Sequence, residues 1–210
     1  MMSTNTSTTP SISGGDSSPD APRPYAVEIQ ICGASDLLFN KWNINGTAGQ
    51  ASRNDFESSV HRCPDGTLAI PGDYLRQAII GAARYQKDQR SPLENAVEIY
   101  KAGIAVVTEL ASLGSRDWDC LDRRRVRSLG RSGAETRTRP AMFPGWRATF
   151  ILEVLLPEYI RPDDLRSAIE DAGRFIGIGD FRPHFGRFTL TKFEVLPPRM
   201  SPSLKFSNLM

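Results

Sequence analysis

Between residues 25 and 197 the chain shows two hydrophobic periods in turn. Strict alternation of apolar and polar residues predicts half-buried strands, whereas a period of 3.6 predicts amphipathic helices. Strand patterns occur in YAVEIQICG from Tyr25, WRATFILEVLLP from Trp146 and RFTLTKFEVL from Arg187. The stretch AGIAVVTEL from Ala102 is rich in β-branched residues, which also favour a strand. Four strands are therefore expected.

Two segments have the helical period. PGDYLRQAIIGAARYQ from Pro71 and RPDDLRSAIEDAGRFI from Arg161 both place a proline and aspartates near the start, as is typical of the first helical turn. Apolar residues recur on one face of each segment: Leu75, Ala78, Ile79, Ala82 and Ala83 in the first, and Leu165, Ala168, Ile169, Ala172 and Ile176 in the second. Each segment therefore predicts a helix with one buried face.

The resulting order is strand, helix, strand, strand, helix, strand. This order predicts an α+β, ferredoxin-like (RRM-like) fold, with an antiparallel sheet and two helices on one face. The last strand should turn Phe188, Leu190, Phe193 and Val195 inward, with Lys192 a further candidate. Long irregular connections are expected over about 34–70 and 111–145, and connections of that length are usually functional.

The domain is expected to span residues 25–197. Residues 1–24 are rich in Ser, Thr, Pro, Gly and Asp, and such a segment cannot bury enough apolar surface to offset its ordering entropy. It predicts a disordered tail, and 198–210 predicts a second, loose or docking tail. The amino-terminal segment lacks an apolar signal core, and no run approaches the ~18 apolar residues of a membrane span. A cytoplasmic protein without membrane contact is expected.

Positive charge is concentrated in the insertion at about 112–145. The formal net charge is only +2, yet the stretch from Ser112 to Arg147 holds nine arginines against four acids, and no lysine. Two short strands around Gly130 to Gly133 predict a projecting basic hairpin, or thumb. Arginine binds phosphate bidentately and stacks on bases, so Arg123, Arg124, Arg125 and Arg127 are candidate nucleic-acid contacts. The alternative is an edge hairpin kept soluble by its charge.

A glycine-rich loop, GIGDFRPHFGRF, joins the second helix to the last strand. Its glycines permit positive φ angles and close backbone approach. Its arginines are candidate phosphate contacts, and Phe181 and Phe185 are candidates for stacking on bases. The candidate binding residues in the loop are Gly177, Gly179, Arg182, Gly186 and Arg187.

The sequence gives little indication of a catalytic site or of a metal site. The cysteines are odd in number, three, without framework spacing, which favours a reducing compartment. His61 and Cys63 lie close together but have few other nitrogen or sulfur ligands available for a tetrahedral site. His184 in the glycine loop is a candidate acid or base, but no partner is evident nearby in the sequence. We therefore expect a non-enzymatic protein without cofactor or metal.

The loop pattern Gly-apolar-Gly followed by aromatic-Gly-Arg-aromatic, and the helix segment AIPGDYLRQAIIGAAR, resemble the RAMP superfamily. These are RNA-recognition-motif-like proteins of CRISPR effector complexes. The resemblance covers roughly 25–197, and the basic insertion sits where the family's backbone subunits often carry a thumb. The loop departs from the family in DFRPH, which replaces a Gly- and Ser-rich stretch, and the chain is short for a backbone subunit.

The resemblance implies a non-catalytic subunit that binds single-stranded guide RNA along its backbone. It also implies a close approach of the Gly179 backbone to RNA and assembly with copies of itself along the RNA, with other effector subunits as further candidate partners. A neighbouring copy would bury Met142, Phe143 and Trp146; the alternative is that these residues pack under the hairpin. Two alternatives stay open. One is a guide-processing ribonuclease that uses His184. The other is a bacterial or phage protein-interaction module on the same fold, anchored through Trp42 or Trp118.

Overall fold

A computed structural model describes residues 23–41, 56–91, 93–127 and 134–197. The expected tails, Trp42 and the turn at Gly130 to Gly133 lie outside these ranges. The central sheet has the order β10-β1-β9-β5, from β1 (Tyr25–Gly33), β5 (Ile104–Val106), β9 (Arg147–Val154) and β10 (Phe188–Leu196). All its pairings are antiparallel. Strands one and four of the predicted pattern thus lie side by side, as in a ferredoxin-like sheet.

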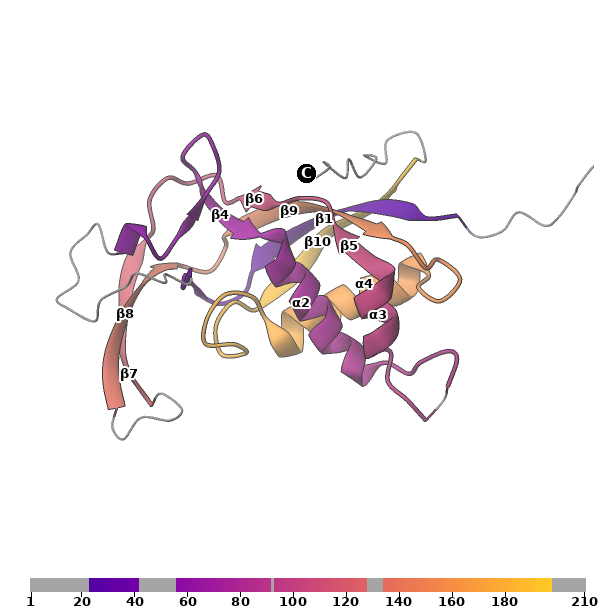
Figure 1. Cartoon of the computed structure of the whole chain (residues 1–210). Coiled ribbons are helices and arrows are strands. Elements are labelled where there is room, and N and C mark those ends of the chain that lie inside the picture. Colours follow the sequence, from indigo (N-terminus) through magenta and orange to yellow (C-terminus); the bar gives the residue numbers. More distant parts are fainter. Residues whose placement is uncertain (1–22, 42–55, 92, 128–133, 198–210) are drawn as a thin grey trace, which may run out of the picture.

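Helices cover one face of this sheet (Figure 1). They are α2 (Gly72–Ala82), extended by a 3₁₀ turn (Ala83–Tyr85), α3 (Val97–Gly103) and α4 (Pro162–Asp171), extended by a π turn (Ala172–Ile176). The α+β, ferredoxin-like prediction is confirmed. No helix in the described ranges is long and apolar enough to cross a membrane.

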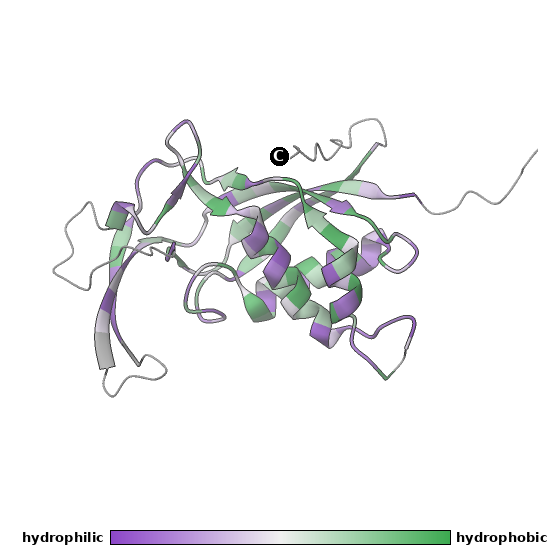
Figure 2. Cartoon of the chain, in the orientation of Figure 1, coloured by the Kyte–Doolittle hydropathy of each residue, from purple (hydrophilic) through white to green (hydrophobic). Residues whose placement is uncertain are grey.

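The core lies between the helices and the sheet, where the green apolar sides of both layers meet (Figure 2). Every second residue of β1 and β9 points into this layer and is buried, as the alternation predicts. The fully buried side chains include Ile29, Ile31, Phe150 and Leu152 from the sheet and Leu75, Ile79, Leu165 and Ile169 from α2 and α4. The apolar faces predicted for both helices are thus the faces that pack.

The strand predicted over AGIAVVTEL from Ala102 is present as β5 but is shorter than expected. Helix α3 continues through Gly103, and only Ile104–Val106 pairs with β9. The residues that follow include β6 (Leu110–Ser112), which belongs to a separate sheet of order β3-β4-β6 with β3 (His61–Arg62) and β4 (Leu68–Pro71). The connection predicted to be irregular over 34–70 therefore contains strands. A short apolar run does not by itself distinguish a buried helix from a buried strand.

The last strand contains a bulge. Gln30 pairs with Lys192, and Ile31 pairs with Leu190, so one extra residue in β10 interrupts the alternation. Lys192 consequently lies with Glu28 and Glu194, 2.6 and 2.7 Å from their carboxylates, and does not turn into the core. Phe188 is buried and Val195 is 45% exposed. The inward positions predicted for β10 thus hold for Phe188 but not for Lys192 or Val195.

The second insertion forms the predicted hairpin from β7 (Cys120–Arg127) and β8 (Ala134–Met142). It projects from the sheet beside the glycine loop, residues 177–187 (Figure 1). Its outer part is mainly hydrophilic (Figure 2). Strand β2 (Leu37–Leu38) pairs with β8 at the base and completes a third sheet of order β2-β8-β7.

Candidate nucleic-acid interface

The glycine loop folds back on itself and on β2. The amide of Ile178 donates to the carbonyl of Gly186 at 2.9 Å, and the amide of Gly186 donates to the carbonyl of Asp36 at 2.8 Å. The amide of Asp180 donates to the carbonyl of Leu38 at 3.1 Å. Since β2 is itself paired with β8, these bonds fix the loop at the base of the hairpin.

Backbone conformation and close contacts within the protein explain why glycine is required at three positions of the loop. Gly177, Gly179 and Gly186 all have positive φ, at 73°, 79° and 70°. A β-carbon on Gly179 would lie 2.7 Å from the carbonyl oxygen of Leu38 and 2.9 Å from Cδ1 of Leu37. Packing against β2 therefore already requires glycine at position 179, and the expected approach of its backbone to RNA stays a prediction.

The side chains of Phe181 and Phe185 in the loop stack against arginines of the hairpin. The guanidinium of Arg124 lies 4.3 Å from the ring centre of Phe185, and that of Arg139 lies 4.7 Å from the ring centre of Phe181. Phe185 is buried and the two rings contact each other edge-on. The expectation that these phenylalanines stack on bases is replaced by an internal arginine–aromatic stack that ties the loop to the hairpin.

Arg139 is the buried centre of this contact. It is only 5% exposed, and its Nε lies 2.5 Å from Oδ2 of Asp180 in the loop. The two atoms are in ionic contact but are not aligned as a hydrogen bond, and Nη1 is likewise buried without a hydrogen-bond partner. Burial lowers the pKa of Arg139, although the carboxylate of Asp180 acts in the opposite direction. The guanidinium remains charged, since arginine is not deprotonated in proteins.

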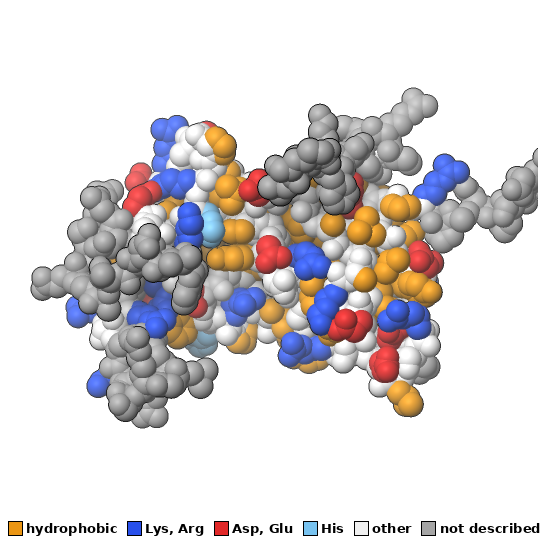
Figure 3. Space-filling view, in the orientation of Figure 1, with side chains coloured by type: hydrophobic (Ala, Val, Ile, Leu, Met, Phe, Trp, Pro, Cys, Tyr) orange, Lys and Arg blue, Asp and Glu red, His pale blue; other side chains and the backbone are white. Residues whose placement is uncertain are grey.

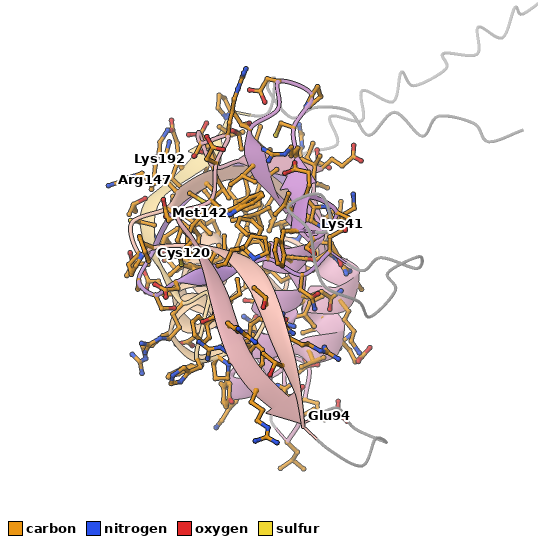
Figure 4. All side chains as sticks on the ribbon, turned by 90° about the vertical axis from the view of Figure 1, so that its left-hand side faces the viewer. Lys41, Glu94, Cys120, Met142, Arg147 and Lys192 are labelled. Carbon is orange, nitrogen blue, oxygen red and sulfur yellow. The ribbon has the colours of Figure 1, made fainter. Side chains whose placement is uncertain are left out.

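The hairpin arginines divide between two faces. Arg124 faces the loop and pairs with Asp122, whereas Arg123 and Arg125 are exposed and form no ion pair with any side chain that the structure describes. Arg127 ends β7, and its side chain lies outside the described ones. Figure 4 views the molecule with the hairpin in front, with Cys120 and Met142 at its base. Of the four predicted contacts, Arg123 and Arg125 are thus available to a ligand, and Arg124 is engaged internally.

Two of the apolar residues expected at a subunit interface are internal. Met142 and Trp146 are 7% and 4% exposed. The indole N–H of Trp146 donates to the carbonyl of Ser35 at 2.9 Å, and its ring fills the space that a β-carbon on Gly33 would need. Phe143, at 54% exposure, is the member of the set that remains open.

A basic groove surrounds the glycine loop. It consists of three adjoining depressions of about 730, 600 and 420 Å³; the first shares Phe175 and Pro183 with the second, and Arg174 and Arg187 with the third. The arginines lining it are all exposed and form no ion pair with a carboxylate of the described residues: Arg84, Arg174, Arg182 and Arg187. Basic side chains recur on the visible face between the hairpin and the helices, with apolar atoms between them (Figure 3). Its lining also includes Glu170 and Asp180, of which Asp180 is paired with Arg139, so the groove carries an excess of positive charge, as phosphate binding needs.

The groove contains residues that the motifs did not reveal. Arg84 and Tyr85 end the first predicted helix segment, and Arg174 and Phe175 end the second. The sequence did contain a signal for these groove residues, since an arginine is followed directly by an aromatic residue near the end of each helix segment. The loop candidates Arg182 and Arg187 do meet these pairs in one groove.

His184 is exposed beside the groove. Its ring lies 5.5 Å from that of Phe185, and it lines the largest depression with Tyr85, Arg174 and Arg187. Within the described ranges, no three His, Cys, Asp or Glu side chains are grouped so that they could hold a metal ion.

The comparisons with known proteins agree with the fold. No family model matches the chain, and no curated protein matches it. Among solved structures, the chain is similar to one in the cryo-EM structure of the Type III-B Cmr-beta bound to cognate target RNA. What the two share is the fold. The TM-score is 0.54 at 16% sequence identity, over 83% of this chain and 61% of the other, so this chain spans less than two thirds of its length.

Proposed function

We propose that this protein is a non-catalytic subunit that binds single-stranded RNA along its sugar-phosphate backbone, as a guide RNA is bound in a CRISPR-like ribonucleoprotein. The observation that carries the proposal is the set of exposed arginines without acidic partners around a rigid loop and on a projecting hairpin. Arginines placed in this way bind phosphates without reading sequence. The resemblance to the RAMP superfamily and the fold shared with a chain of an RNA-bound assembly support the same function.

The biological form that follows from this proposal is an assembly in the cytoplasm. Copies of the protein line up along one RNA, together with other effector subunits. Because Met142 and Trp146 are buried, a neighbouring copy would contact the base of the hairpin through Phe143 and Leu121, which are 54% and 45% exposed.

The hairpin provides the test of RNA binding. Changing Arg123 and Arg125 to alanine is expected to weaken binding of unstructured oligouridylate and of other unstructured RNAs alike. The slope of log affinity against log salt should fall by about 0.7 for each arginine–phosphate interaction that the substitutions remove. Fluorescence anisotropy over a salt series measures both quantities. Neither side chain packs against the core, so the melting temperature should stay unchanged.

The matched control removes two positive charges elsewhere. Arg166 and Lys101 are exposed on α4 and α3, and their alanine variants should bind RNA with the wild-type salt slope. An unaltered slope in the Arg123 and Arg125 variant would mean that these arginines only keep the hairpin soluble. If the wild-type protein purifies free of nucleic acid and binds no RNA, the interaction module becomes the better proposal.

The alternative as a guide-processing ribonuclease rests on His184, which is exposed in the groove. We expect no cleavage of RNA in metal-free buffer, because general acid–base cleavage requires a second positioned group. Gel analysis of end-labelled RNA after long incubation tests this for wild type and for His184→Ala. Specific cleavage by the wild type that disappears in the variant would establish the ribonuclease instead.

A further inference from the structure

The largest depression of the basic groove has aromatic walls. It has a volume of about 730 Å³ and is lined by Tyr85, Arg174, Phe175, Pro183, His184 and Arg187. We call it the aromatic pocket. A phosphate contact alone needs no such walls, since charged and polar donors suffice. Binding of the RNA backbone therefore does not explain why aromatic rings line this pocket.

Two of its rings are exposed although they lie in contact. Tyr85 is 64% exposed and Phe175 is 38% exposed. Their ring centres lie 5.6 Å apart at an interplanar angle of 61°. A pair of large apolar rings left in water beside a pocket is typical of a recognition surface.

Cations flank the rings. The guanidinium of Arg174 lies 4.3 Å from the ring centre of Phe175, and Arg187 lines the same pocket from the start of β10. Within the described part of the chain neither forms an ion pair with a carboxylate, and the same holds for Arg84 in the adjoining depression. Aromatic rings interleaved with free arginines match a ligand that carries flat rings joined by negative charges.

The walls of the pocket are held rigidly. Tyr85 and Phe175 extend from the ends of the two core helices, which pack against the sheet. The opposite wall, Pro183 and His184, belongs to the glycine loop, which is fixed to β2 and to the hairpin arginines. A preformed pocket binds a ligand without the entropic cost of ordering its own walls.

We propose that the aromatic pocket binds an unstacked base of the single-stranded RNA, with Tyr85 and Phe175 as the stacking platform and Arg174 and Arg187 on the flanking phosphates. The inference rests on the proposed RNA binding and adds to it the part of the nucleotide that is recognised. Every base has a flat aromatic face, so stacking of this kind tolerates any sequence.

The test separates bases from phosphates. The probes are oligoadenylate and an abasic oligomer of equal length, which keeps the riboses and phosphates. Stacking of one base on an aromatic side chain corresponds to roughly 5- to 150-fold in affinity. The Tyr85→Leu, Phe175→Leu double variant is expected to lose affinity for oligoadenylate by about 10-fold, to bind the abasic oligomer like wild type, and to keep the salt slope.

Leu155→Ala is the matched control, since Leu155 is a 41% exposed apolar residue outside the pocket and outside the proposed contacts between copies. It should leave both affinities unchanged. Oligoadenylate carrying one 2-aminopurine should change its fluorescence on binding wild type and not on binding the double variant. Circular dichroism confirms folding, and Tyr85→Leu alone serves if the double variant is unstable, because Tyr85 is the more exposed ring.

The outcomes distinguish the two proposals. If wild type binds both oligomers equally and the double variant behaves like wild type, the pocket does not hold a base, while RNA binding along the backbone stands. If wild type binds neither oligomer, the proposed function fails and this inference fails with it.

Discussion

Replacing Gly186 by alanine is expected to lower the free energy of unfolding by about 3 kcal/mol, which corresponds to a fall of roughly 6–12 °C in the melting temperature. Gly186 has a φ of 70° and is buried. A β-carbon there would lie inside the contact distance of the carbonyl oxygen of Ile178. The obstacle is backbone held by a hydrogen bond between the same two residues, so it cannot yield as a flexible side chain would.

Gly114 provides a control that isolates the cost of the backbone conformation. Its φ is 73°, close to that of Gly186, but a β-carbon on it would meet no atom within 4 Å. Gly114→Ala should therefore cost only about 1 kcal/mol. Thermal unfolding followed by circular dichroism compares the two. Equal losses would show that the contact with Ile178 is relieved at little cost and that the loop is softer than its packing indicates.

Asp180→Ala is expected to destabilise the protein by about 2–3 kcal/mol, because it leaves the buried charge of Arg139 without its counter-ion. The value lies below the range for fully buried pairs because the Asp180 side chain is 27% exposed. Adding Arg139→Met should restore much of the loss, since methionine fills the volume of the arginine stem without a charge. Urea unfolding of both single variants and of the double variant gives the coupling energy.

The matched control is an exposed ion pair. Lys101 and Glu98 lie one turn apart on α3 with side chains 51% and 73% exposed, and Glu98→Ala should change stability by less than about 0.5 kcal/mol. If Asp180→Ala were equally mild, the loop and the hairpin would be held together by the arginine–aromatic stack alone. If the double variant were no more stable than Asp180→Ala, Arg139 would owe its burial to packing and not to its charge.

The sequence predicted the central layer of the fold because that layer follows local rules. Alternation identified β1 and β9, and proline with aspartate marked the start of both core helices. The strand predicted from Ala102 was too long, because the apolar run continues from the end of α3 into β5 and has no distinguishing period. Alternation failed at Lys192, because a bulge is a property of two paired strands and not of one sequence.

The site was predicted only in outline for a related reason. The sequence alone does not distinguish an arginine or aromatic residue that is free to bind a ligand from one that packs against another part of the protein. Phe181 is covered by Arg139 and Phe185 by Arg124, contacts between segments that are distant along the chain. Tyr85 and Phe175 carry weaker local signals, and the fold alone brings them together at 5.6 Å. Local motifs therefore located the groove, but long-range packing decides which of its side chains can reach a ligand.

The position of β1 has a consequence for how the protein is made. This early strand lies in the middle of the sheet, and both of its partners, β9 and β10, come late in the chain. The contact between Glu28 and Lys192 spans 164 residues. During synthesis the first strand therefore leaves the ribosome with both edges open and cannot pair until β9 has been translated, and its second edge stays open until β10 follows. The apolar strand β1 is thus the segment that a chaperone would need to shield until its partners are made.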